Sequence, residues 1–395
     1  MRILALSGWF PVPPDNGARI RTHALLRALT EAGHEVELIA FHRRPLPDGA
    51  ALDLPCRLRA AIPYPGEAGA AWWHWLSPRP RSLRAGYSPA MARAVARALA
   101  EVDYDRIVSF EIGPGTLTSH YVPHRYAARQ VVEDLELWML WGQVLDAPSA
   151  AVRLRRRLMW AKAANYTRGL LRRVCGCTVA SEQEAALVRR LVPQARLAVV
   201  PNGVDAEACT PAPPEAVERS TLIFPGSLTY AANFRAMRFF LAEVWPRVRA
   251  VHPEARLRIT GSTRGVDLAA LPLDEGVELT GYVPQIRPLI ARSTLCVVPI
   301  LEGGGTRLKV LEAMACGTPV VATPKGAEGL AVRDGEHLLL AEGAEAFAAA
   351  VIRLLEDEAL RRRLGEAGRA LVVRRYDWRR IGATFERFVG GCVEG

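Results

Sequence analysis

Residues 299–321 read PILEGGGTRLKVLEAMACGTPVV, and this stretch decides the fold class. An apolar run, typical of a buried strand, leads into three glycines and Thr306, a residue suited to begin a helix. The pattern predicts a helix from Thr306 to Cys316, ended by Gly317 and followed by a second apolar strand. A strand, a glycine loop and a helix in this order are typical of α/β proteins, where free backbone N–H groups and the helix N-terminus bind anions.

Two cations and one carboxylate in this stretch are unusual. Arg307 and Lys309 fall in the first turn of the predicted helix, where positive charge is unfavourable by roughly a few tenths of a kcal/mol. A bound polyanion would compensate, and the alternative is a solvated helix start. Glu312 falls on or beside the face that should be buried, where a carboxylate needs hydrogen-bond donors. Ribose hydroxyls next to a diphosphate would supply them, and the alternative is a structural pair with an arginine.

The rest of the chain alternates between apolar runs and amphipathic stretches, which predicts parallel sheets covered by helices on both faces. The predicted strands are Arg2–Ser7, Glu35–Phe41, Arg106–Phe110, Gln130–Val132, Cys177–Ala180, Leu197–Val200, Thr221–Phe224, Arg256–Thr260, Leu295–Pro299 and Pro319–Ala322. Thr210–Pro214 interrupts the alternation with structure breakers and is predicted to link two domains.

A chain of 395 residues is longer than one core usually serves, so two α/β domains are expected. We predict two doubly wound Rossmann-like domains that face a cleft. Residues 1–205 form the N-terminal domain and residues 206–375 the C-terminal domain, while residues 376–395 form a helix expected to pack back on the N-terminal domain. Ligands of such sheets bind at the carboxyl ends of the strands, so the cleft is the expected site.

The composition and the charge distribution narrow the class of protein. Half of the residues are hydrophobic and 23% are charged, which excludes a mostly disordered or fibrous chain. The formal net charge is +10, and residues 1–200 carry 27 Lys+Arg against 17 Asp+Glu, so the surplus lies in the first half. Such asymmetry indicates an anionic partner for that half: a phosphorylated acceptor, a membrane surface or nucleic acid.

Neither the spacing of the cysteines nor the pair of aspartates at 103 and 105 indicates a metal site. Seven cysteines lack metal-site spacing and are interpreted as reduced thiols, mostly in the core. Asp103-Tyr104-Asp105 imitates a metal-binding D-x-D sequence, but acids that precede a strand are ordinary loop residues. His120 and His124 are interpreted as structural. Glu111 and Glu133-Asp134 follow predicted strands at their carboxyl ends and are better placed to contact an acceptor.

Glu302–Val321, together with Pro201–Asp205, Gly33–Val36 and Gly281–Val283, resembles the retaining glycosyltransferase family 4, which has the GT-B fold. The resemblance covers nearly the whole chain, and its most specific part is Leu311–Val321. It implies transfer of a sugar from a nucleotide-diphosphate donor with retention at the anomeric carbon. It also implies no cofactor and no required metal, since the nucleotide sugar is a substrate.

The resemblance further implies roles for individual residues. In the family, the glutamate that matches Glu312 holds the donor ribose, and the loop before it meets the diphosphate and the sugar. The implied donor-binding residues are Gly226, Ser227, Gly281, Tyr282, Val283, Gly304, Gly305, Thr306 and Glu312. The residues that we expect to be catalytic are Glu302, Arg307 and Lys309. The residues expected to face the donor phosphates and the acceptor are Asn16, Gly17, Arg19 and Glu111.

Two departures from the family pattern concern charge. The family usually places a first glutamate eight positions before the second, but that position is Gly304 here and the nearest carboxylate is Glu302. The family also often carries an arginine and a lysine after the first strand of the second domain, and Gly226–Asn233 contains neither. We therefore expect Arg307 and Lys309 to replace the missing cations.

Other functional classes compete with a sugar transferase. A dinucleotide dehydrogenase would need G-x-G-x-x-G after the first strand, and Ser7–Pro11 offers nothing of this kind. No nucleic-acid recognition motif is present, so nucleic acid is not an expected partner. A sugar-nucleotide epimerase or hydrolase, or a non-catalytic sugar-nucleotide-binding protein on the same fold, stays open because fold does not fix reaction.

Two basic, tryptophan-containing segments raise the hypothesis of a membrane surface as partner. The chain has no window of about 18 uncharged apolar residues and no start typical of a secretory signal, which predicts a cytoplasmic protein that spans no membrane. Trp72–Trp75 is followed by arginines, and Arg153–Arg173 is basic and rich in leucine, a combination typical of interfacial helices. The hypothesis is peripheral association at the inner face of a membrane, and the alternative is a basic helix with its apolar side in the core. The acceptor, whether a sugar, a lipid-linked molecule or a small molecule, is not identified.

Overall fold

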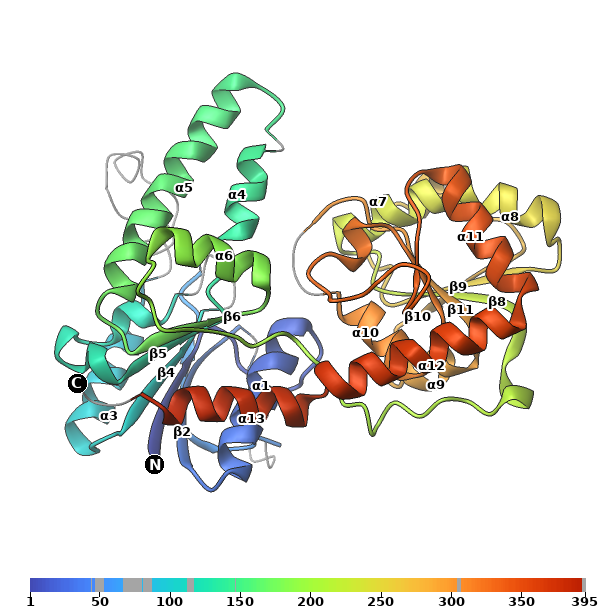
Figure 1. Ribbon diagram of the computed structural model, residues 1–395. Helices are drawn as coiled ribbons and strands as arrows, with labels where there is room; N and C mark the ends of the chain where they lie inside the picture. Colours follow the sequence, from blue (N-terminus) through green and yellow to red (C-terminus); the bar gives the residue numbers. More distant parts are fainter. Residues whose placement is uncertain are drawn as a thin grey trace. The chain divides into compact units, whose positions relative to one another are not determined.

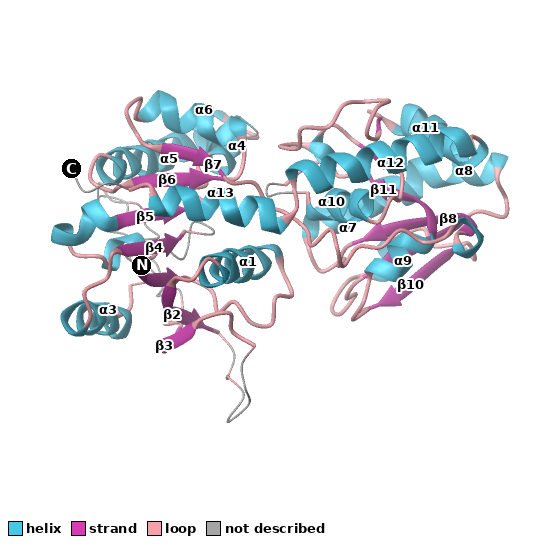
Figure 2. Cartoon of the chain, turned by 60° about the horizontal axis from the view of Figure 1, so that its bottom comes forward, coloured by secondary structure: helices cyan, strands magenta, loops and turns pink. Residues whose placement is uncertain are grey.

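The computed structural model describes residues 1–43, 45–46, 53–66, 80, 87–111, 117–145, 147–303 and 307–392. The chain divides into two compact units. Unit 1 comprises Met1–Pro201 and Ile381–Gly395, and unit 2 comprises Asn202–Arg380. Each unit contains one parallel sheet with helices packed on its faces, as Figures 1 and 2 show. The predicted fold class, two Rossmann-like α/β domains, is confirmed.

The sheet of unit 1 has the strand order β3-β2-β1-β4-β5-β6-β7, and all of its pairs are parallel. Its strands are β1 (Arg2–Ser7), β2 (Glu35–His42), β3 (Arg57–Pro63), β4 (Arg106–Phe110), β5 (Gln130–Glu133), β6 (Gly176–Val179) and β7 (Leu197–Val199). Its helices are α1 (Gly17–Glu31), α3 (Pro89–Glu101), α4 (Trp138–Leu145), α5 (Ala150–Leu171), α6 (Glu182–Leu191) and most of α13 (Trp378–Gly390). The central strand β1 is fully buried from Ile3 to Leu6, as its continuous apolar run predicts.

The sheet of unit 2 has the order β10-β9-β8-β11-β12-β13 and is also parallel. Its strands are β8 (Glu218–Pro225), β9 (Arg256–Thr260), β10 (Val277–Gly281), β11 (Ser293–Val298), β12 (Val320–Ala322) and β13 (Leu339–Leu340). Its helices are α7 (Ala231–Phe239), α8 (Trp245–Val251), α9 (Arg287–Arg292), α10 (Leu308–Ala315), α11 (Ala344–Glu356) and α12 (Glu358–Arg375). A π-helical turn, Phe240–Val244, joins α7 to α8.

The chain crosses between the units at Pro201–Asn202, not at the predicted linker Thr210–Pro214. The segment after the crossing belongs to unit 2 because Arg369 of α12 holds its backbone. One guanidinium nitrogen of Arg369 donates to Cys209 O at 2.6 Å, and another donates to Ala206 O at 3.4 Å. The chain returns to unit 1 at Ile381, five residues after the predicted start of the C-terminal helix at residue 376.

The C-terminal helix α13 packs on unit 1 and ends in a disulfide. Phe385 is fully buried with its ring centroid 6.4 Å from that of Phe110 in β4. Cys392, just after the helix, is bonded to Cys175, just before β6, with Cα atoms 5.9 Å apart. The prediction that all seven cysteines are reduced thiols is therefore wrong for this pair, which lies 217 residues apart in sequence and is brought together only by the returning helix.

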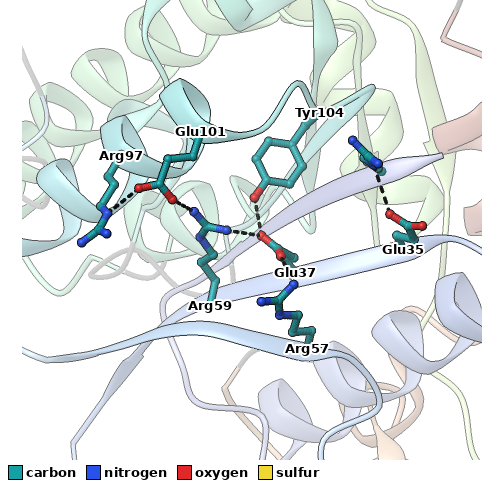
Figure 3. Close-up of polar contacts among 8 residues, drawn as sticks. Glu35, Glu37, Arg57, Arg59, Arg97, Glu101 and Tyr104 are labelled. Atoms are coloured by element: carbon teal, nitrogen blue, oxygen red, sulfur yellow. Dashed lines mark hydrogen bonds and ion pairs between the residues drawn. The ribbon is translucent and has the colours of Figure 1, made fainter.

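The strand β3 at the edge of unit 1, which the sequence pattern missed, is held by ion pairs as well as by the packing of Ala60 and Ile62 on the core. Figure 3 shows Glu37 of β2 between two arginines of β3, with 3.1 Å to Arg57 Nη1 and 3.1 Å to Arg59 Nη1. Tyr104 donates its hydroxyl to the same carboxylate, and Glu101 of α3 pairs with Arg59. The two ends of β3 are exposed and the residues between them are only partly buried, so the strand lacks the fully buried apolar run by which the central strands are recognised.

A fully buried ion pair fixes the carboxyl end of β5 in unit 1. Arg21 of α1 is 1% exposed and donates from Nε to Glu133 Oε1 at 2.9 Å and from Nη2 to Val200 O at 2.8 Å. Asp134 follows with φ of +58°, and its carboxylate lies 3.5 Å from Arg21 Nε. Burial raises the pKa of Glu133 and Arg21 opposes this rise. The single cation thus joins α1, β5 and the end of β7.

We expect Arg21→Met to destabilise unit 1 by about 3–5 kcal/mol, because it leaves the Glu133 carboxylate buried without its cation. The double variant Arg21→Met/Glu133→Met should recover most of that loss, since it removes both charges and keeps apolar volume. Chemical denaturation followed by circular dichroism measures both. If the double variant is less stable than Arg21→Met alone, the buried charge is not the source of the loss.

Candidate functional site

The site is built on two neighbouring strands of unit 2, β8 and β11, whose carboxyl ends carry the loops 226–230 and 299–303. The loop after β8 needs small residues. A Cβ atom on Gly261, which has φ of +94°, would lie 2.6 Å from the backbone of Ser227. A Cβ atom on Gly226 would lie 2.9 Å from Lys309 Nζ. Glycine at both positions therefore allows β9, β8 and α10 to approach within contact distance.

Lys309, in the first turn of α10, directs its ammonium group toward the loop after β8. Nζ donates to Asn233 Oδ1 at 2.8 Å and lies 4.1 Å from the ring centroid of Phe224. Asn233 in turn donates to Ser227 O at 2.8 Å, which fixes its amide. Burial lowers the pKa of Lys309 to about 7. Within the described residues, no carboxylate forms an ion pair with this ammonium group.

Arg307 has a different environment from Lys309. It is 7% exposed and stands at the N-cap position, because α10 begins at Leu308 rather than at Thr306. Its Nε donates to Lys325 O at 3.0 Å, its Nη2 donates to Gly303 O at 3.0 Å, and Glu328 lies at 3.5 Å. Burial lowers the pKa of Arg307, and Glu328 opposes this. Through these bonds Arg307 connects the glycine loop to the turn after β12.

Glu302 and Tyr230 lie next to Gly303, the first glycine of the loop. The Glu302 carboxylate forms an ion pair with Arg235 of α7, and both side chains are about half-exposed. A Cβ atom on Gly303, which has φ of +94°, would lie 3.1 Å from the Tyr230 hydroxyl oxygen. Gly304, Gly305 and Thr306, predicted to contact the donor, lie outside the described residues.

Glu312 is half-buried in α10, one turn after Leu308. Burial raises its pKa, and the charges of Arg287 and Lys309 oppose the rise. Within the described part of the chain, no group forms a hydrogen bond or ion pair with its carboxylate. The structural pair with an arginine, the alternative weighed from sequence, is therefore not formed. An unpaired carboxylate at this depth is suited to accept hydroxyl groups of a ligand.

The predicted base-binding residues follow β10. Gly281 has φ of +68° and accepts the N–H of Gly261 at 2.8 Å, which joins the ends of β9 and β10. Tyr282 is 74% exposed, and Val283 is half-buried. An exposed aromatic ring at the edge of the sheet is available for stacking on a planar ligand.

The predicted residues of unit 1 lie at the carboxyl ends of β1 and β4. Asn16 caps α1 by accepting the N–H of Arg19 at 3.2 Å, and Gly17 is the first helical residue. Arg19 Nη1 pairs with Asp15 at 2.9 Å. Glu111 is 2% exposed, and its Oε1 accepts the N–H groups of Thr118 and Ser119 at 2.8 and 2.5 Å.

Burial raises the pKa of Glu111 to about 7, against the effect of these backbone donors. Its second oxygen, Oε2, is buried without a hydrogen bond. His120 is packed 4.0 Å from the ring centroid of Tyr121, and burial lowers its pKa to about 4. His124 lies 3.1 Å from Arg173 Nη1. These contacts agree with the structural interpretation of both histidines.

Asp103 and Asp105 have partners of their own. Asp103 pairs with Arg129 at 2.5 Å, and Asp105 accepts the N–H of Arg2 at 2.7 Å. Over the described ranges, no group of three or more His, Cys, Asp or Glu side chains is arranged to hold a metal ion. No helix in the part of the chain that the structure describes is long and apolar enough to cross a membrane.

The structure brings Lys309, Gly226 and Ser227 together, and it adds residues that the sequence did not indicate. Asn233 and Arg235 were missed because their partners, Lys309 and Glu302, are about 70 residues away in sequence and meet them only when β8 pairs with β11. Glu184 was also missed. It accepts the N–H groups of Leu137 and Trp138 and so fixes the start of α4.

Known proteins resemble the chain over both units. Residues 15–208 match the family model described as Glycosyltransferase Family 4, and residues 219–357 match the one described as Glycosyl transferases group 1. A phosphatidyl-myo-inositol mannosyltransferase of Mycolicibacterium smegmatis is 27% identical over 396 residues, which cover 96% of this chain and 90% of that protein. A GDP-mannose-dependent monoacylated alpha-(1-6)-phosphatidylinositol monomannoside mannosyltransferase of Corynebacterium glutamicum is 31% identical over 203 residues, 46% of this chain and 53% of the relative. In this second case the match spans about half the length of the relative.

Solved structures agree on the fold. A sucrose-phosphate synthase from Thermosynechococcus elongatus superposes with a TM-score of 0.68 at 21% identity, over 98% of each chain. WaaG, a glycosyltransferase involved in lipopolysaccharide biosynthesis, superposes with a TM-score of 0.67 at 16% identity, over 99% of this chain and 100% of that chain. With family models matched across both parallel-sheet units, the chain belongs to glycosyltransferase family 4 and has the GT-B fold.

Proposed function

We propose that this glycosyltransferase moves a sugar from a nucleoside-diphosphate donor to an acceptor, with retention of the anomeric configuration and without a required divalent metal. The observation that carries the proposal is Lys309. Its ammonium group is buried beside Gly226 and Asn233 at the carboxyl ends of β8 and β11, with no paired carboxylate among the described residues. An ammonium group in such a place is prepared for an anionic ligand.

The donor would lie over the loops of unit 2. Lys309 and the N–H groups of Gly304 and Gly305 would stabilise the diphosphate, which brings about two negative charges and gains charge as its bond to the sugar breaks. Glu312 would accept the ribose hydroxyls, and Tyr282 with Gly281 and Val283 would border the base. These assignments follow the family resemblance and agree with the half-buried, unpaired carboxylate of Glu312 and the exposed ring of Tyr282.

The sugar would lie near Glu302, which takes the role of the absent first glutamate while Arg235 positions its carboxylate. Arg307 donates to Lys325 O and Gly303 O and pairs with Glu328, so we propose that it positions the glycine loop. No carboxylate can be assigned as a nucleophile. We therefore propose attack of the acceptor on the same face, assisted by the leaving diphosphate.

The acceptor would bind on unit 1, where Asn16, Gly17, Arg19 and Glu111 occupy the carboxyl ends of β1 and β4. The mannosyltransferase relatives named above have phosphatidylinositol-type acceptors in their names, and unit 1 carries the excess of positive charge. We propose an acceptor that is a sugar, a lipid-linked molecule or a small molecule, so that the enzyme acts in the synthesis of a glycan, a glycolipid or a glycosylated metabolite, with peripheral association at the inner face of a membrane.

A panel of sugar nucleotides, incubated with and without candidate acceptors, tests the reaction class. Release of nucleoside diphosphate that depends on an acceptor supports transfer. An isomerised donor would indicate an epimerase, acceptor-independent release a hydrolase, and binding without turnover a non-catalytic protein; each of these outcomes would overturn the proposal.

Lys309→Ala should lower kcat/KM for the donor about 10- to 100-fold, because one charge-assisted hydrogen bond contributes roughly 1.5–3 kcal/mol. Lys309→Arg should restore only part, since the guanidinium is larger and planar. The matched control is Lys325→Ala, whose ammonium group pairs with Glu328 at 2.6 Å. Equal activity and equal stability of Lys309→Ala and Lys325→Ala would remove the phosphate assignment.

The same lysine predicts a pH dependence. The pKa of Lys309 is lowered to about 7, so the charged form that binds a diphosphate declines as the pH rises through 7. We expect kcat/KM for the donor to fall above about pH 7 in the wild type, and the Lys309→Arg variant to keep its lower activity to higher pH because arginine stays charged. Identical pH profiles for the two proteins would contradict this.

Glu312→Ala should weaken donor binding about 10-fold or more and change kcat less, because the ribose contact is made equally in the ground and transition states. Isothermal titration of the nucleoside diphosphate together with steady-state kinetics measures the split. Glu366→Ala, an exposed glutamate of α12, is the matched control. Unchanged donor affinity in Glu312→Ala would refute the ribose contact.

Activity should persist in a chelator, because Lys309 and backbone N–H groups supply the positive charge that a metal would otherwise provide. The measurement compares initial rates of sugar transfer in EDTA, magnesium and manganese. Full loss of activity in EDTA, restored by either metal, would count against the proposal. Product anomeric configuration, read by NMR coupling constants, tests retention separately.

A further inference from the structure

The helices α4 and α5 form an antiparallel hairpin that stands off from the sheet of unit 1, with their connection at the far end, as Figure 1 shows in green. The two helices are held together by Trp141 and Trp160, whose ring centroids are 4.9 Å apart. Arg156 Nη1 also donates to Gln143 O at 2.6 Å. Leu170 and Leu171, at the other end of α5, are buried in the core of unit 1. The base of the hairpin is thus packed, and its far end is not.

The far end exposes large apolar side chains to solvent. Leu154 is 61% exposed, Leu145 58%, Leu158 57% and Met159 43%. Leu145 closes α4, and the other three lie in the first half of α5, so all four belong to the same end of the hairpin. Isolated exposed leucines are ordinary, but a cluster on a projecting element marks an interaction surface.

Arginines are interleaved with these apolar residues. On α5, Leu154 and Leu158 form one row, Arg153 and Arg157 form the next row, and Arg155 lies one turn from Met159. The whole of α5 carries six Lys or Arg residues and no Asp or Glu. We define the hairpin tip as Leu145, Arg153, Leu154, Arg155, Arg157, Leu158 and Met159.

We propose that the hairpin tip docks on the surface of an anionic membrane. Leucine and methionine side chains would enter the boundary between head groups and acyl chains, while the arginines reach the anionic head groups beside them. The absence of acidic residues from α5 favours a uniformly negative partner over a protein surface of mixed charge. The proposal rests on the membrane association proposed above and names the surface that would make it. It does not depend on the donor site of unit 2, and Trp72–Trp75, the other segment considered from sequence, lies outside the described residues.

Vesicle flotation of the full chain tests the proposal. The vesicles are pure phosphatidylcholine or phosphatidylcholine with about one-third phosphatidylglycerol. Each arginine near an anionic surface strengthens partitioning about five-fold, so Arg153→Gln/Arg155→Gln/Arg157→Gln should lose on the order of 100-fold on anionic vesicles. Leu154→Ser/Leu158→Ser should lose about 10-fold or more. Arg156 is kept because it bonds to Gln143 and holds the hairpin closed.

The matched control removes the same charge elsewhere. Arg362→Gln/Arg363→Gln/Arg374→Gln changes three exposed arginines of α12 in unit 2 and should float as the wild type does. Equal recovery of the wild type on neutral and anionic vesicles, or equal recovery of the hairpin-tip variants and the wild type, would overturn the proposal.

Hydrogen exchange of the wild type with anionic vesicles gives a reading that does not depend on a variant folding correctly. We expect protection of residues 147–160, and protection only elsewhere would overturn the proposal. Donor turnover with a soluble acceptor, measured on the same variants, separates the two claims. Hairpin-tip variants that turn over donor normally but no longer float support the docking surface. If the wild type floats through this tip but does not turn over donor, the docking surface is supported and the proposed sugar transfer is refuted.

Discussion

The parallel pairing of β8 with β11 is the constraint from which the arrangement in unit 2 follows. Leu222 pairs with Leu295 and Ile223 with Cys296, so both strands reach the same edge of the sheet and deliver their loops side by side. The loop after β8 leads into α7, whose Asn233 accepts a hydrogen bond from Lys309 at 2.8 Å, and Lys309 lies in the first turn of α10, the helix after β11. Neither segment forms the site alone, because one supplies the amide of Asn233 and the other the ammonium group of Lys309. The site thus depends on the pairing of the two strands. Gly226 and Gly261 are required because a Cβ atom at either position would collide with Lys309 or with the backbone of Ser227.

Unit 1 fixes its own strand ends by a different means, buried carboxylates. Glu111 accepts backbone N–H groups of the turn at Ser119–Tyr121, Glu133 accepts from Arg21, and Glu184 accepts from the start of α4. Burial raises the pKa of all three, to about 7 for Glu111 and Glu184. Each carboxylate accepts hydrogen bonds from a donor of another element, which adds to the apolar packing of Tyr121 and Val122 after β4 and of Leu135 and Leu137 after β5. This arrangement orders the base of the α4–α5 hairpin and leaves its far end exposed.

Local sequence patterns predicted most of the fold because a buried parallel strand is a short apolar run, and such runs are visible without partners. Arg2–Ser7, Arg106–Phe110 and Arg256–Thr260 were predicted with the bounds that the structure gives. The predictions failed where the structure of a segment depends on contacts with residues far away in the sequence. β3 forms ion pairs with Glu37, Cys175 bonds to a cysteine 217 residues away, and the segment just before Thr210–Pro214 is held at Ala206 and Cys209 by an arginine of α12. The same distinction holds for the candidate site. The spacing of the sequence indicated the glycine loop and Lys309. The contacts of Asn233 and Arg235, and the bonds by which Arg307 holds the loop, form only when distant segments meet.

The returning helix α13 makes unit 1 discontinuous along the chain, and this has a consequence for biosynthesis. Residues 202–380 are translated between the two parts of unit 1 and form a sheet with contacts of its own, so unit 2 has all its strands while unit 1 still lacks its last helix. Until Ile381–Cys392 leaves the ribosome, Phe110 is without Phe385, and Arg106 is without the carbonyl groups of Val389 and Cys392. The newly made N-terminal part therefore exposes an apolar strip until α13 covers it. During this interval the strip is a surface to which a chaperone can bind.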